Sequence, residues 1–85
     1  MYFVYMLECK NGAYYTGITT NIERRFNEHL QDKAKGAKYT RINKPVRIIY
    51  KEVCENRSLA TSREIDIKKL SRAEKELLVA NVNLQ

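Results

Sequence analysis

Three short hydrophobic runs, rich in aromatic and β-branched side chains, stand out along the chain. They cover residues 2–8, 13–18 and 46–53, and their composition predicts three β-strands. The sequence Lys-Asn-Gly at 10–12 is a turn signal, so the first two strands are expected to form a hairpin.

The length of the hairpin loop decides how two tyrosines lie. A two-residue loop pairs Tyr5 with Ile18 and puts Tyr5 and Tyr15 on opposite faces of the sheet. A three-residue loop, with Gly12 in the left-handed conformation, pairs Tyr5 with Gly17 and puts both tyrosines on one face. The sequence permits either loop, and the tyrosines can act together only with the second.

A helix is predicted directly after the hairpin. Ile22, Phe26 and Leu30 recur every four residues and are expected to form its buried stripe. The pattern from Thr20 to Glu23 fits a capping box, in which a hydroxyl and a carboxylate accept hydrogen bonds from backbone N–H groups at the start of the helix.

Two basic residues of this helix, Arg25 and His29, lie four positions apart. At about 100° per residue they share one edge of the stripe, where a side chain is neither fully buried nor fully exposed. A side chain that reaches into a cleft beside the core would occupy such a position.

A second helix is predicted over 58–70, with Ala60 and Ile67 on its apolar face. Glu64 falls in the middle of that face, where a carboxylate needs a partner or a metal. The sequence Ser-Arg-Ala-Glu at 71–74 is a second capping box and predicts a third helix.

These patterns give the order β-β-α-β-α-α. We expect an α+β fold in which helices flank a three-stranded antiparallel sheet, with residues 1–85 forming one domain. No apolar run approaches the roughly 20 residues of a membrane span. The first residues lack the basic segment of a signal peptide, so a cytoplasmic protein is expected, in which Cys9 and Cys54 stay unpaired.

The net charge is +6, and much of it is concentrated in one stretch. Seven basic residues and no acidic one lie from 33 to 51: Lys33, Lys35, Lys38, Arg41, Lys44, Arg47 and Lys51. Because so many cations repel one another, the stretch favours a nucleic-acid partner over a bare solvated surface. We assign the contact to its residues up to Arg47, Tyr39 included. Gly36 and Pro45 interrupt the stretch, so a membrane-binding helix is not expected.

The order of the tyrosines and of the residues after them resembles the GIY-YIG nuclease superfamily. Residues 3–5 (Phe-Val-Tyr) take the place of its first motif, and residues 15–17 (Tyr-Thr-Gly) take the place of its second. Phe3 replaces the first glycine and Thr16 replaces the second isoleucine, whereas the tyrosines and the last glycine are kept.

The resemblance continues along the chain. Arg25 and His29 match the basic pair on the first helix of the family, and Glu64 matches its metal-binding carboxylate. Segments 36–41 and 67–75 are similar to the small stand-alone bacterial branch, the UPF0213-type proteins.

The resemblance implies a metal-dependent endonuclease that hydrolyses phosphodiester bonds in DNA, on repair or recombination structures. The implied catalytic set is Tyr5, Tyr15, Gly17, Arg25 and His29, with Glu64 holding one Mg²⁺ or Mn²⁺ ion.

Each residue of this set has an implied role. Tyr5 is the general base; a free phenol has a pKa near roughly 10, so Arg25 and the metal must lower it. Arg25 also clamps the phosphate through its guanidinium fork. His29 relays the proton or orients Tyr5, and Tyr15 positions water or phosphate. Gly17 allows a close backbone approach where strand meets helix.

Two other functions stay open. One is a non-catalytic nucleic-acid-binding module that keeps the fold. The other is a structural adaptor that binds an acidic protein through residues 33–51. Many nucleases of the family place an Asn after the metal helix, and Asn81 and Asn83 are the candidates here. The preferred nucleic-acid structure, DNA or RNA as substrate, and the oligomeric state also stay open.

Overall fold

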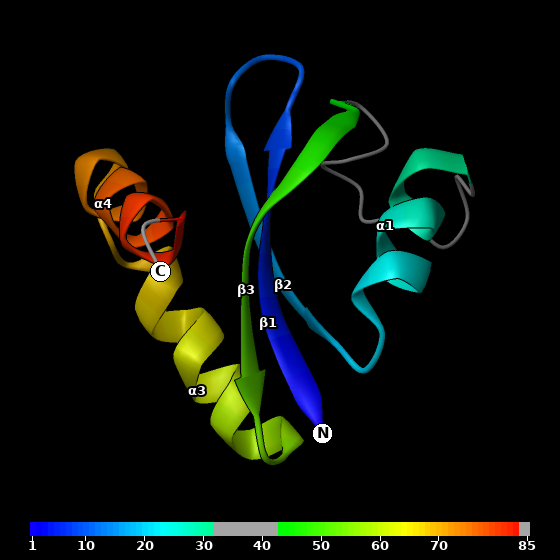
Figure 1. The fold of residues 1–85 in the computed structure, drawn as a ribbon, viewed down its shortest axis with the longest axis vertical. Helices are drawn as coiled ribbons and strands as arrows, with labels where there is room; N and C mark the ends of the chain where they lie inside the picture. The colour runs from blue at the N-terminus through cyan, green and yellow to red at the C-terminus, as the bar shows by residue number, and fades with distance from the viewer. Residues whose placement is uncertain (32–42, 84–85) are drawn as a thin grey trace.

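The computed structural model describes residues 1–31 and 43–83, and over these residues the order β-β-α-β-α-α is confirmed (Figure 1). The strands are β1 (Tyr2–Cys9), β2 (Tyr14–Thr19) and β3 (Pro45–Cys54); the helices are α1 (Ile22–Gln31), α3 (Arg57–Lys68) and α4 (Arg72–Asn83). Within the described ranges, none of the helices is long and apolar enough to cross a bilayer.

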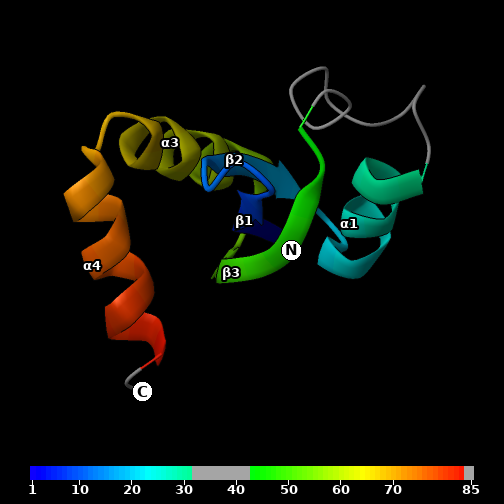
Figure 2. The ribbon, with the colours of Figure 1, turned by 90° about the horizontal axis from the view of Figure 1, so that it is seen from above.

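The three strands form one antiparallel sheet in the order β2-β1-β3, so the first strand lies in the centre. Helix α1 lies on one side of the sheet, and α3 and α4 lie on the other (Figures 1 and 2). Because side chains of a strand alternate between faces, β1 contributes side chains to the packing on both sides of the sheet. Val4 and Met6 are fully buried with Ala60 and Ile67 of α3, whereas Tyr5 faces α1.

The hairpin between β1 and β2 has the three-residue loop of the two alternatives. Gly12 has a φ of +84°, and its N–H donates to the carbonyl of Cys9 at 2.8 Å. In the resulting register Tyr5 pairs with Gly17 and Leu7 pairs with Tyr15. Tyr5 and Tyr15 therefore lie on the same face of the sheet, as a joint role requires.

The loop of this hairpin is held by the last described helix. Nη1 of Arg72, at the start of α4, donates to the carbonyl of Gly12 at 2.7 Å. The Arg72 guanidinium also lies 3.7 Å above the centroid of the Tyr14 ring, a cation–π contact. Two contacts from one side chain thus join the start of β2 to α4.

The start of α1 differs from the prediction. The cap is Asn21 rather than Thr20: the side-chain oxygen of Asn21 accepts from the N–H of Arg24 at 3.0 Å. Thr19 positions the cap, because its hydroxyl accepts from the N–H of Asn21 at 3.2 Å. At α4, by contrast, the capping box is confirmed, since Ser71 and Glu74 exchange both hydrogen bonds.

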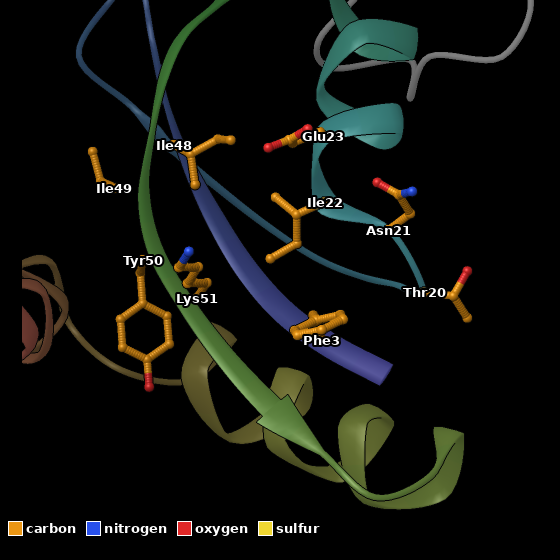
Figure 3. Close-up of a pocket in the computed structure, with 9 residues that line it drawn as sticks. All are labelled: Phe3, Thr20, Asn21, Ile22, Glu23, Ile48, Ile49, Tyr50 and Lys51. Carbon is orange, nitrogen blue, oxygen red and sulfur yellow. The ribbon is translucent and has the colours of Figure 1, made fainter. Parts of the chain in front are cut away.

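The stripe predicted on α1 is less buried than expected. Ile22, Phe26 and Leu30 are half-buried, whereas His29 is the residue that this helix buries fully. At Ile22, a groove of about 640 Å³ lies between the first turn of α1 and β3. Figure 3 shows Ile22 facing Ile48 across this groove. The first turn of α1 is therefore only partly covered by β3.

Candidate active site

Three aromatic side chains from three elements meet on the α1 side of the sheet. The ring centroids of Tyr5 (β1) and Tyr15 (β2) lie 6.4 Å apart. The ring centroid of His29 (α1) lies 6.2 Å from that of Tyr5 and 5.2 Å from that of Tyr15. The hydroxyl of Tyr5 and Nε2 of His29 form a buried hydrogen bond of 3.0 Å. The predicted convergence of the two tyrosines with His29 is therefore found in the structure.

Gly17 makes room for this cluster. A Cβ atom added at Gly17 would lie 2.6 Å from the hydroxyl oxygen of Tyr5 and 2.8 Å from its Cζ. Both distances are too short for non-bonded atoms. The structural reason for a glycine here therefore differs from the predicted backbone approach at the strand–helix junction: the Tyr5 ring lies across residue 17.

Arg25 reaches the same cluster from α1. Its guanidinium donates a hydrogen bond to the hydroxyl of Tyr5. Its Nη1 also lies 3.0 Å from Oε1 of Glu28, three residues further along the helix. The side chain of Arg25 is 25% exposed, so part of it remains open to a ligand. Arg25 thus borders the cluster, whereas His29 is 1% exposed and lies inside it.

Burial controls the protonation of the cluster. Burial raises the pKa of Tyr5, and the nearby Tyr15 raises it further; Arg25 opposes both effects but does not outweigh them. Burial also raises the pKa of Tyr15. For His29, burial and then the positive charge of Arg25 lower the pKa to about 4. Arg25 alone therefore does not bring the pKa of Tyr5 below its ordinary value, and the expectation that Arg25 and a metal together lower it stays a prediction.

At neutral pH the cluster consequently contains a neutral phenol next to a neutral imidazole. The hydroxyl of Tyr5 accepts from the cationic Arg25 and shares its other hydrogen bond with Nε2 of His29. A neutral imidazole has a lone pair that can accept a proton. The arrangement can therefore move a proton from the phenol to His29 while Arg25 stabilises negative charge on the phenol oxygen.

Glu64 approaches the cluster from α3. Its carboxylate adds to the raised pKa of both Tyr5 and Tyr15, which places its charge near the two phenols. The side chain is 19% exposed, and Oε2 lies 3.5 Å from Nζ of Lys68. Glu64 is thus a half-buried carboxylate whose charge acts on both phenols, and its placement in the same cleft stays a prediction.

The donor atoms at Glu64 suit a hard divalent cation. Within residues 1–31 and 43–83, no group of three or more His, Cys, Asp or Glu side chains could hold a metal ion. A cage made of protein ligands alone is thus not available in this part of the chain. One carboxylate oxygen is, however, a usual protein contribution to Mg²⁺, which retains waters and takes other ligands from substrate phosphate. Glu64 fits such a site.

The residues predicted to contact nucleic acid are only partly described. Lys33, Lys35, Lys38, Tyr39 and Arg41 lie outside the described residues. Lys44 donates from Nζ to the carbonyl of Leu30 at 3.1 Å, near the end of α1. Arg47 is 68% exposed and pairs with Glu8 across the sheet at 2.6 Å. Lys44 therefore has a structural contact, and the guanidinium of Arg47 remains accessible.

The groove between α1 and β3 does not coincide with the aromatic cluster. None of its lining residues belongs to the predicted site, although Lys51 stands beside Tyr5 in the sheet register. Figure 3 shows the groove bordered by Phe3, Ile22 and Ile48. We place the candidate chemistry at the cluster because polar and titratable groups converge there.

Two residues at the site were missed from the sequence. Glu28 forms an ion pair with Arg25, and Lys68 forms an ion pair with Glu64. Spacings of three and four residues within a helix bring such pairs together, so opposite charges at these spacings were the available signal.

The fold and this cluster agree with comparisons to known proteins. A family model described as the GIY-YIG catalytic domain matches residues 1–77. A UPF0213 protein from Desulfotalea psychrophila is 53% identical over 92% of this chain and 70% of its own length. A UPF0213 protein from Natronomonas pharaonis is 50% identical over 94% of this chain and 92% of its own length.

Two solved structures are also similar. The solution NMR structure of a UPF0213 protein from Bacillus halodurans has 43% identity and a TM-score of 0.58, over 94% of this chain and 84% of that one. The solution NMR structure of a protein from E. faecalis has 39% identity and a TM-score of 0.64, over 99% and 88% of the two chains. With the tyrosine pair, the glycine beneath it and the matching family model, the chain belongs to the GIY-YIG nuclease family.

Proposed function

We propose that this protein is a metal-dependent endonuclease that hydrolyses phosphodiester bonds in DNA. The observation that carries the proposal is the buried hydrogen bond between the Tyr5 hydroxyl and Nε2 of His29, beside Arg25 and Glu64. Burial alone requires a partner for each polar atom, so the weight of this hydrogen bond comes from the charged Arg25 and Glu64 that act on the same phenol. Membership of a nuclease family supports nucleic acid as the substrate.

In this proposal Tyr5 and His29 activate water as a pair. The Tyr5 oxygen removes a proton from the attacking water while the phenol proton moves to His29. The lowered pKa of His29 keeps the imidazole neutral at neutral pH, so a ring lone pair is present for that proton, although the same shift makes the ring a weaker base than a free histidine. Arg25 stabilises the charge that develops on the Tyr5 oxygen and on the phosphate, because its guanidinium offers several donors in one plane. Tyr15 orients the water or the phosphate.

Glu64 is the proposed ligand of one Mg²⁺ or Mn²⁺ ion. When bound, such an ion supplies Lewis-acid stabilisation of the scissile phosphate and of the leaving oxygen. The half-buried carboxylate contributes a hard oxygen ligand on the edge of the cluster.

The basic stretch that starts at Lys33 is proposed to bind the phosphate backbone. Its support is the seven cations without an intervening acid. Such contacts position a nucleic acid without reading its sequence. We therefore expect this stretch to contribute affinity, with the chemistry confined to the Tyr5 cluster.

A cleavage assay tests the proposal. Branched, single-stranded and duplex DNA, and RNA of matched sequence, are incubated with the protein and Mg²⁺ or Mn²⁺. We expect metal-dependent cleavage that falls by roughly a hundredfold or more in Tyr5→Phe, which keeps the ring but loses the hydroxyl. Tyr14→Phe is the matched control, because Tyr14 is a neighbouring strand tyrosine that packs with the opposite face. Equal rates for both variants, or no cleavage of any substrate, would contradict the proposal.

The ion pair between Glu64 and Lys68 favours a second candidate, a non-catalytic module that binds nucleic acid. A carboxylate that is permanently neutralised by lysine would not hold a metal. DNA binding that is unchanged by chelator, together with absent turnover, would support this candidate.

A further inference from the structure

Glu64 and Lys68 form an unequal pair on α3. Nζ of Lys68 lies 3.5 Å from Oε2 of Glu64, one helical turn apart, with the acidic residue first in the chain. This order is the favourable one for an i,i+4 pair. The Lys68 side chain is 55% exposed, whereas that of Glu64 is 19% exposed. The carboxylate is thus mostly enclosed, and the ammonium is mostly in water.

Pairs with one such exposed partner are weak, because solvent screens the attraction and ordering the long side chain costs entropy. The ammonium of Lys68 can therefore leave Glu64 without unfolding the helix. A divalent cation at the same carboxylate would stand close to this ammonium and repel it. The two cations cannot both use Oε2 of Glu64 at short range.

We propose that Lys68 occupies Glu64 in the free protein and is displaced when a divalent cation binds, so that Lys68 sets the metal affinity of the site. The inference rests on the proposed function, since it takes Glu64 as the metal ligand. It adds a residue that competes with the metal, and it reconciles the observed ion pair with a metal-dependent reaction. Lys68 acts through Glu64 and is in this sense a positioning residue.

Mn²⁺ binding to the full chain without nucleic acid tests the inference, with free Mn²⁺ followed by electron paramagnetic resonance. We expect Lys68→Met, which keeps the aliphatic stem, to lower the Kd for Mn²⁺ about fivefold. Lys69→Met is the matched control, because Lys69 is the adjacent exposed residue and the variant loses the same charge. Its Kd should equal that of the wild-type protein. Lys68→Arg, which keeps a cation, should also bind like wild type.

Each other outcome has a defined meaning. Equal tightening in Lys68→Met and Lys69→Met would show a general effect of charge and would overturn the inference. An unchanged Kd in Lys68→Met, with binding lost in Glu64→Gln, overturns the role of Lys68 alone and leaves the proposed function standing. Unchanged Mn²⁺ binding in Glu64→Gln overturns both the metal assignment and the inference. Far-UV circular dichroism of each variant verifies the fold.

Discussion

The ring of Tyr5 lies directly over Gly17 on the neighbouring strand, so that a Cβ at residue 17 would stand 2.6 Å from the Tyr5 hydroxyl. The two residues are partners in the hairpin register. The Tyr5 ring can therefore occupy this position only because Gly17 has no side chain. This relationship explains in steric terms why the residue opposite Tyr5 in this hairpin is a glycine.

The first prediction concerns Gly17→Ala. The added methyl must displace the buried Tyr5 ring, which breaks the hydrogen bond to His29 and strains the packing. We expect a loss of about 1–3 kcal/mol in the free energy of unfolding, measured by urea denaturation, and loss of any cleavage. Gly12→Ala is the control, because φ at Gly12 is +84° and no heavy atom lies within 4 Å of an added Cβ. It should lose stability through backbone strain yet keep its cleavage rate.

The second prediction concerns the protonation of His29, the single histidine of the chain. Its pKa in the folded protein is about 4, below the ordinary value of 6.5, because the ring is buried near Arg25. The imidazole signal in NMR spectra should therefore titrate near pH 4. A midpoint near 6.5 in the folded protein would show that the ring is open to water.

The same shift makes stability depend on pH. Because the folded pKa is the lower one, protonation favours the unfolded chain. The contribution of neutral His29 to the free energy of unfolding is complete above pH 6.5 and is lost as the pH falls toward 4, with a total of about 3 kcal/mol. His29→Gln should show a smaller loss than the wild-type protein over this interval, measured as unfolding free energy by urea titration at each pH. Parallel curves for the two proteins would refute this account.

The third prediction concerns Arg25. Arg25→Ala should slow single-turnover cleavage by roughly a hundredfold or more, while the equilibrium affinity for DNA changes little. Arg25→Lys should not restore the rate, because an ammonium lacks the planar two-point contact. Arg24→Ala is a close control: Arg24 is the preceding residue, is 57% exposed and also faces Glu28, at 3.9 Å. Equal losses of rate and affinity in Arg25→Ala would make it an ordinary binding residue.

The fourth prediction concerns the basic stretch. Binding to duplex DNA should weaken steeply with salt, with a log–log slope of about −0.9 for each phosphate contacted. Replacing Lys35, Lys38 and Arg41 together by alanine should flatten this slope, as measured by fluorescence anisotropy at several salt concentrations. Replacing Lys44 alone should mainly affect stability, since its ammonium binds the carbonyl of Leu30. A slope that the triple variant leaves unchanged would place the binding surface elsewhere.

The elements were predictable from the sequence because their signals are local. Strand composition, the Lys-Asn-Gly turn and the capping box at Ser71 each depend on a few adjacent residues, and the structure confirms all three. The cap of α1 was misplaced by one residue, because Thr19, Thr20 and Asn21 can all cap, and the choice depends on how β2 ends.

The site was harder to predict, because its chemistry depends on burial. The residues of the cluster can be named from the sequence, but the burial of His29 cannot, because it depends on how α1 packs against the sheet. Nor does it show that burial outweighs the effect of Arg25 on the Tyr5 phenol, since both act through space between separate elements. The ion pair between Glu64 and Lys68 could have been predicted from their spacing of four residues alone.

The hold of Arg72 on the hairpin has a consequence for how the protein is made. Tyr5, Tyr15, Arg25 and His29 all belong to the part of the chain that a ribosome synthesises first. The loop that aligns the two tyrosines is nevertheless held by a residue 60 positions after Gly12. A nascent chain therefore carries every side chain of the cluster long before Arg72 is available to fasten the turn. A truncated chain that ends before α4 would therefore keep the side chains of the candidate site but lose this restraint on their alignment.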